Sequence, residues 1–119
     1  MPEDEEQAPA DDAVLVDVRP GAMWLAGGLS AASHGRIRLR RSGERRDALL
    51  VGPMTPDHVR ELREECGPDE VIVTVDGRAV LTPTAIAETF RAGASDVIAG
   101  PDLLVVVARL EALLRRHRR

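Results

Sequence analysis

The chain has 119 residues, of which 44% are hydrophobic and 30% charged, a composition typical of one globular domain. Aromatic residues make up only 2%, so we expect an aliphatic core and no base-stacking platform for single-stranded nucleic acid. Its 16 strongly basic residues are all arginine, which excludes Schiff-base chemistry and phosphate loops that need a lysine. The single cysteine, Cys66, is typical of a reducing compartment. With no secretory signal and no apolar run of membrane-spanning length, we expect a cytoplasmic protein without membrane contact.

The acidic residues are concentrated at the start of the chain. Residues 1–12 contain six acids and no base, and we expect them to form a disordered acidic tail. Residues 13–119 carry 14 acids against 16 arginines, so this expected domain has a net charge near +2.

Five short runs rich in aliphatic residues predict strands. They cover 13–18, 36–41, 47–52, 70–75 and 95–99. The run 36–41 alternates arginine with apolar residues, which is typical of an edge strand with one solvated face.

Four helices are predicted, over 22–35, 55–66, 82–92 and 102–117. The first is weakened by Gly27-Gly28. The second and third each begin with a threonine N-cap followed by proline, at Thr55 and Thr82. The last helix has one apolar face at helical spacing, formed by Leu103, Val106, Val107, Leu110, Leu113 and Leu114.

Strands alternate with helices along the chain, which predicts a parallel sheet covered on both faces. One connection breaks this pattern. Between 36–41 and 47–52 there is room for a turn but not for a crossover helix, which needs a dozen or more residues. The sequence leaves open whether the strand over 36–41 is parallel or part of a hairpin.

Residues 87–116, AETFRAGASDVIAGPDLLVVVARLEALLRR, resemble the last helix, strand and helix of a response-regulator receiver domain. The positions that fit are Phe90, Ala92 to Ala94, Asp96 to Ile98, Pro101, Ala108 to Leu110 and Ala112 to Arg116. The resemblance implies an α/β, flavodoxin-like three-layer sandwich with a central, mostly parallel five-stranded sheet and helices on both faces. The stretch 19–46 fits poorly, because the second helix is short or missing.

The resemblance also locates the positions of receiver chemistry. The phosphorylated aspartate at the end of the third strand corresponds to Gly52, which has no carboxylate. The lysine after the fifth strand corresponds to Gly100, while Pro101, which in receivers usually follows a cis bond, is kept. The switch threonine or serine corresponds to Thr74. These replacements predict a pseudo-receiver with a degenerate phosphorylation pocket.

Only Asp17 represents the acidic pair that binds Mg²⁺ in receivers, with Arg19 nearby. One carboxylate beside a cation is a poor magnesium site. Asp17 is either a remnant metal ligand or, as we favour, a strand-end carboxylate that is hydrogen-bonded to nearby backbone. Asp47, at the opposite end of the sheet, is given no role. His34, His58 and His117 are scattered, so no metal site and no cofactor is predicted.

Two basic clusters have competing interpretations. The arginines of 36–46 either receive an acidic partner or phosphates, or protect an edge strand. The run 115–119 either contacts nucleic acid or stabilises a helix C-terminus, and we favour the second. Nucleic-acid binding by this domain alone is therefore not expected.

Many receivers dimerise through their last helix–strand–helix face, where a reciprocal aspartate and arginine pair across the interface. Asp96 and Arg109 match that pair. Phe90, Leu104 and Val105 would add apolar contacts, so the resemblance implies a homodimer or a protein partner in signalling.

The leading hypothesis is a non-enzymatic, phosphorylation-independent regulatory module of two-component signalling, with a role in transcription regulation among the possibilities. The alternative is a sensor that binds a small metabolite in the degenerate pocket. An enzyme is the weakest hypothesis, because the strand ends carry few polar groups.

Overall fold

The computed structural model describes residues 13–78 and 80–117, so the predicted acidic tail lies outside the described residues. The elements, in chain order, are β1 (Val14–Val18), the 3-10 helix η2 (Pro20–Leu25), α2 (Leu29–Ala32), β2 (Ile37–Leu39), β3 (Ala48–Val51), α3 (Pro56–Cys66), β4 (Ile72–Asp76), α4 (Pro83–Ala92), β5 (Asp96–Ala99) and α5 (Leu103–His117).

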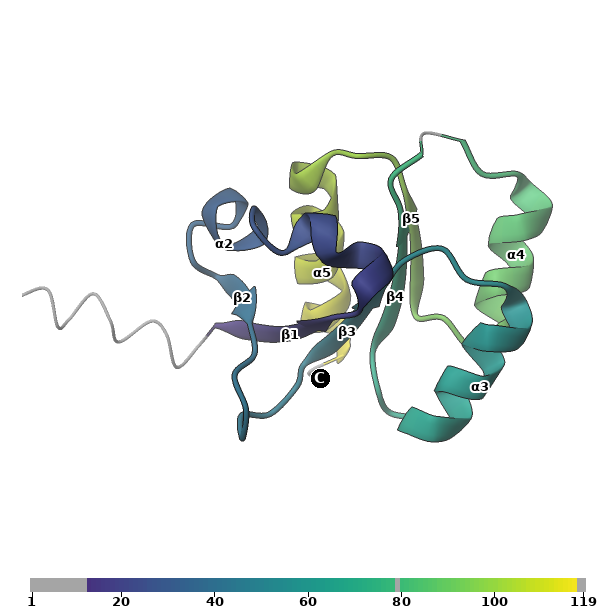
Figure 1. Ribbon diagram of the computed structural model, residues 1–119, viewed down its shortest axis with the longest axis horizontal. Helices are drawn as coiled ribbons and strands as arrows, with labels where there is room; N and C mark the ends of the chain where they lie inside the picture. The colour runs from purple at the N-terminus through teal and green to yellow at the C-terminus, as the bar shows by residue number, and fades with distance from the viewer. Residues whose placement is uncertain (1–12, 79, 118–119) are drawn as a thin grey trace, which may run out of the picture.

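The five strands form one sheet in the order β2-β1-β3-β4-β5, and every neighbouring pair is parallel. Helices η2, α2 and α5 pack on one face, and α3 and α4 pack on the other (Figure 1). The predicted flavodoxin-like sandwich is therefore confirmed.

Alternation along the strands places the core on both faces of the sheet. In β3, Ala48 and Leu50 point toward α5, whereas Leu49 and Val51 point toward α3. The predicted apolar face of α5 packs in the larger cluster. Strands buried on both faces need the near-continuous aliphatic runs that the sequence contains.

Helices α3 and α4 begin where the threonine–proline pairs predicted. The Thr55 hydroxyl accepts a hydrogen bond from the backbone N–H of His58 at 3.2 Å, and that of Thr82 accepts one from Ala85 at 3.1 Å. Each cap satisfies a backbone donor that has no partner within the helix.

The predicted helix over 22–35 is wrong as a continuous element. The chain forms η2, passes through Gly27-Gly28, and then makes the single turn α2. A Cβ at Gly28 would collide with the side chain of Leu103 on α5. Glycine therefore allows this segment to lie close against α5 and also ends regular helix at the same place.

The register explains how β2 joins β3 without a helix. Val16 of β1 pairs with Leu39, the last residue of β2, and on its other side with Ala48, the first residue of β3. The chain leaves β2 at the level where β3 starts, so it crosses β1 without travelling back along the sheet. We call residues 40–47 the crossing link. The hairpin alternative is wrong, and β2 is a parallel edge strand.

Arg63 of α3 connects the two helices on their face of the sheet. Its Nε and Nη2 donate to the carbonyl oxygen of Gly93 at 3.0 and 2.7 Å, and its Nη1 donates to those of Gly67 and Glu70 at 2.8 and 2.6 Å. One side chain thereby satisfies backbone acceptors at the ends of α3 and α4.

Candidate functional site

Four of the five residues of the predicted phosphorylation pocket lie at or near the carboxyl edge of the sheet. Gly52 follows β3 directly, and Gly100 and Pro101 follow β5. Thr74 lies within β4, opposite Val51 and Val97. Thr74 is therefore one position short of the level of Gly52, and it lies on the face covered by α3 and α4.

The position of the phosphorylated aspartate is closed by the protein's own backbone. A Cβ at Gly52 would lie 2.5 Å from the carbonyl oxygen of Gly21 in η2 and 2.8 Å from its Cα. Real Cβ atoms do not approach backbone this closely, so no side chain fits at position 52 unless η2 moves. Position 52 therefore lacks a carboxylate and also lacks the space for one.

The position that the resemblance assigns to the lysine has an unusual backbone conformation. Gly100 has a φ of 103°, which is unfavourable for any residue with a side chain. Its N–H donates to the carbonyl oxygens of Asp76 and Arg78, each at 2.8 Å. The peptide bond to Pro101 is trans, as are the other described peptide bonds, so the cis bond usual in receivers is not kept. The positive φ of Gly100 turns the chain instead.

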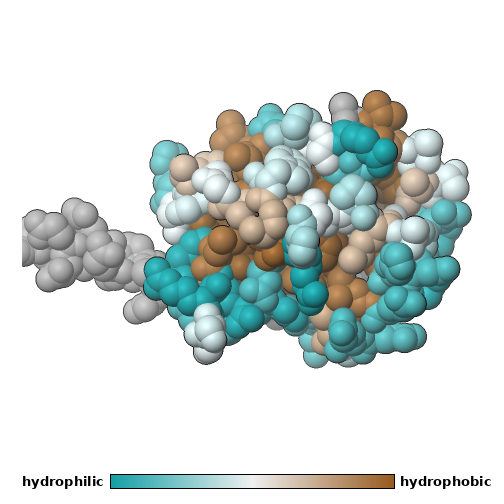
Figure 2. Space-filling view, viewed as in Figure 1, coloured by the Kyte–Doolittle hydropathy of each residue, from teal (hydrophilic) through white to brown (hydrophobic). Residues whose placement is uncertain are grey.

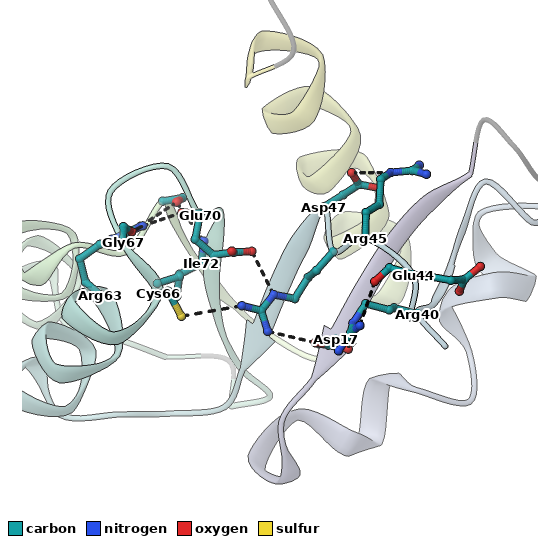
Figure 3. A network of polar contacts seen from close by, with 12 residues as sticks. Asp17, Arg40, Glu44, Arg45, Asp47, Arg63, Cys66, Gly67, Glu70 and Ile72 are labelled. Carbon is teal, nitrogen blue, oxygen red and sulfur yellow. Dashed lines mark hydrogen bonds and ion pairs between the residues drawn. The ribbon is translucent and has the colours of Figure 1, made fainter. Parts of the chain in front are cut away.

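Asp17 is bound by two arginines of the crossing link rather than by nearby backbone, which corrects the favoured interpretation (Figure 3). Arg40 Nε donates to Oδ1 at 2.9 Å, and Arg46 Nη1 donates to Oδ2 at 3.0 Å. Burial alone would raise the pKa of Asp17, but these hydrogen bonds and charges lower it below its usual value. With a guanidinium on each oxygen, the charge of Asp17 is already compensated, which makes it a poor metal ligand.

The arginines that hold Asp17 belong to a wider network. Arg46 also donates through Nε to Glu70 at 3.0 Å, and Arg38 binds both carboxylate oxygens of Glu44 at 3.1 and 2.8 Å. The resulting hydrophilic region is visible at the lower left of the face in Figure 2, over the crossing link. This ion-pair network fastens the link across β1, where the sequence predicted that the second helix is short or missing.

Sequence reasoning missed the partners in this network, above all Arg46 and Glu70. The available signal was the arginine-rich run 36–46, which contains Glu44 and is followed directly by Asp47. Asp47, which was given no role, accepts a hydrogen bond from the backbone N–H of Leu15 at 2.8 Å. It also forms an ion pair with Arg45 at 3.1 Å.

The arginines of 36–46 are mostly neutralised within the domain. Five of the six form ion pairs with carboxylates: Arg36, Arg38, Arg40, Arg45 and Arg46. This pairing favours the protected edge over a surface for phosphates or an acidic partner.

The elements around β5 carry the predicted interaction face. Phe90 on α4 is 42% exposed, and Leu104 and Val105 on α5 are 65% and 43% exposed. Arg109 and Asp96 form an ion pair within the chain. Val105 lies one helical turn before Arg109, so its exposed side chain is close to this ion pair. Leu104 lies on another side of α5, the side of Glu111, which pairs with Arg36 next to β2.

Within residues 13–78 and 80–117, no group of three or more potential metal ligands comes together. In the same residues, no helix is both long and apolar enough to cross a membrane.

No protein-family model and no curated protein sequence matches the chain. Its structure, however, resembles solved response regulators over most of its length. An orphan response regulator of H. pylori has a TM-score of 0.65 at 20% identity, and the match covers 87% of this chain and 98% of that one. A response regulator from Thermotoga maritima has a TM-score of 0.68 at 18% identity, with coverages of 87% and 98%.

A third similar structure is an atypical orphan response regulator described as having a phosphorylation-independent regulatory mechanism. It has a TM-score of 0.60 at 19% identity, and the match covers 85% of this chain and 94% of the other. At these identities the likeness concerns the fold.

Proposed function

We infer that this chain, which has the fold of a response-regulator receiver domain, regulates a partner through its surface and is not switched by phosphorylation. The observation that carries this proposal is the contact between Gly52 and Gly21, which leaves no room for an acceptor side chain. Asp17, the remaining acid of the usual magnesium pair, is already neutralised by two arginines.

The face around β5 is the surface through which we propose that the protein binds a second copy or a protein partner. Its exposed apolar residues Phe90 and Val105 would lose water contact on binding. The partner that this face binds determines which process the protein regulates, whether transcription or another signalling step. Catalysis and nucleic-acid binding play no part in the proposal, and the location we propose is the cytoplasm.

The alternative of a metabolite in the degenerate pocket is disfavoured at Gly52 itself, because the backbone of Gly21 occupies the space. A separate pocket lies beside Thr74, on the face of the sheet covered by α3 and α4.

The proposal is tested by incubating the protein with acetyl phosphate, or with beryllofluoride, in the presence of Mg²⁺. A phosphorylatable receiver serves as the positive control. We expect no change in mass and no Mg²⁺-dependent NMR shift around Asp17, Gly52 and Thr74. A covalent phosphoryl adduct, or such a shift, would overturn the proposal.

A further inference from the structure

A small pocket lies between the ends of β3 and β4 and the start of α4, beside the closed position of Gly52. Its volume is about 180 Å³. Its walls are mainly apolar and include Met54, Leu81, Ala85 and Val97. A cavity of about 150 Å³ is enough for benzene, so this pocket suits only a compact ligand.

Two buried polar side chains line the pocket. Thr74 is only 6% exposed, and its hydroxyl makes no hydrogen bond with any residue that the structure describes. The side chain of Asp76 is 7% exposed. The hydroxyl group of Thr74 is therefore open to the cavity, where it can hydrogen-bond to water or to a ligand group.

Among the residues that the structure describes, the cation paired with Asp76 is Arg78, whose side chain lies largely in solvent. Arg78 donates through its backbone N and Nε to Oδ1 at 3.0 and 3.1 Å, and through Nη2 to Oδ2 at 2.8 Å. The Arg78 side chain is 75% exposed, so its guanidinium returns to solvent when another cation takes its place beside the carboxylate of Asp76. A cation that enters the pocket can therefore replace the guanidinium at small cost.

We propose that this pocket binds a small primary amine with a compact apolar body. The ammonium group lies between the carboxylate of Asp76 and the hydroxyl of Thr74, and the apolar body contacts Leu81, Ala85 and Val97. The site does not depend on the interaction proposed for the face around β5.

The charge of the site selects against other ligands of this size. Hydrogen bonds from Arg78 outweigh burial and lower the pKa of Asp76 below its usual value, so the group is an anion at neutral pH. A buried carboxylate requires a cation beside it and repels a ligand carboxylate. A neutral ligand would leave Arg78 in place and would gain apolar contact and at most a hydrogen bond with Thr74.

The experiment uses benzylamine as the probe, with benzyl alcohol and benzoate as neutral and anionic controls. Each is titrated into the ¹⁵N-labelled full chain, and amide shifts are followed by NMR. We expect saturable shifts with benzylamine at Thr74, Asp76 and Thr89. The amide of Gly100 should shift as well, because it donates to the carbonyl oxygens of Asp76 and Arg78.

Four variants locate the binding. Asp76→Asn should weaken benzylamine binding about tenfold or more, because a charged hydrogen bond is lost. Thr74→Val removes the hydroxyl at nearly constant volume and should weaken it several-fold. Ala85→Leu should fill the pocket and abolish binding. Asp57→Asn, which removes an acid from an exposed ion pair with Arg60, is the matched control and should change nothing.

No shift with benzylamine at millimolar concentration would overturn the proposal. Equal binding of benzyl alcohol, or unchanged binding in Asp76→Asn, would overturn the recognition of an amine. If Asp76→Asn does not fold, the comparison of benzylamine with benzyl alcohol and the Ala85→Leu variant decide the question.

Discussion

Arg109 of α5 binds both carboxylate oxygens of Asp96 of β5 in the same chain. Its Nε lies 3.0 Å from Oδ2 and its Nη2 lies 2.7 Å from Oδ1. If these residues also pair across a two-fold dimer, each protomer exchanges an internal ion pair for an external one. An exchange of equivalent pairs contributes little net affinity, so dimerisation must depend on the burial of apolar surface.

This relationship predicts which substitution disrupts a dimer. We expect wild type to dimerise at high micromolar concentration, Val105→Glu to be monomeric, and Arg109→Ala to weaken the dimer less than tenfold. Val105 is 43% exposed, so the glutamate has little effect on the core. Light scattering and sedimentation equilibrium measure the dissociation constants. A monomeric wild type would end the dimer hypothesis, and a dimer lost only in Arg109→Ala would contradict the exchange argument.

A second prediction concerns restoration of the acceptor. Gly52→Asp should not become phosphorylated by acetyl phosphate and should lower the free energy of unfolding by about 1–3 kcal/mol or more, because its Cβ overlaps the backbone of Gly21. Urea unfolding and intact-mass measurement test both parts.

The matched control for this substitution is Gly27→Asp. Nothing lies within 4 Å of a Cβ at Gly27, and its φ needs no glycine. This variant should therefore unfold nearly as wild type does. Phosphorylation of Gly52→Asp at wild-type stability would show that η2 yields easily and that the pocket is not closed.

The third prediction concerns Arg63. Arg63→Met should destabilise the fold by about 2–4 kcal/mol, because the carbonyl oxygens of Gly67, Glu70 and Gly93 lose their donor. Arg63→Lys should rescue little, since an ammonium cannot match the fork of a guanidinium. Arg60→Met on the same helix removes only an exposed ion pair with Asp57 and should leave the urea midpoint unchanged. Equal effects at both positions would disprove the role of Arg63.

The fourth prediction is an acid dependence of stability. Hydrogen bonds from Arg38 lower the pKa of Glu44 to about 2, and the pKa of Asp17 is also lowered. A carboxyl whose pKa is lower in the folded state stabilises the fold above its unfolded pKa, and this contribution disappears as the pH falls through the folded pKa. The free energy of unfolding should therefore fall between about pH 5 and pH 2.

In Asp17→Asn, the free energy of unfolding should depend less steeply on pH in this acid range. At pH 7 it should be lower than that of wild type by about 1–2 kcal/mol, because two arginines lose their common partner. Urea unfolding at a series of pH values provides the measurement, and Asp57→Asn is the exposed control. If the free energy of unfolding falls as steeply with decreasing pH in Asp17→Asn as in wild type, Asp17 does not contribute to the acid dependence.

Local signals in the sequence were sufficient to predict most of the strands and helices. The aliphatic runs predicted the strands to within two residues, and Thr55-Pro56 and Thr82-Pro83 fixed the starts of α3 and α4. These signals succeed because capping and strand alternation act between residues that are close in sequence. The failure at 22–35 arose where Gly28 packs against Leu103, a contact between residues far apart in the chain.

The sequence by itself thus determined the order of the elements, the two-sided aliphatic core and the absence of a carboxylate at position 52. Only the tertiary structure decided that β2 is parallel, that Asp17 pairs with Arg40 and Arg46, and that Gly21 closes the space at Gly52. Each of these depends on strand register and on how η2 and the crossing link lie against β1 and β3. Register brings together residues 23 or 29 positions apart, as in the two ion pairs of Asp17, and no local pattern specifies such a distance.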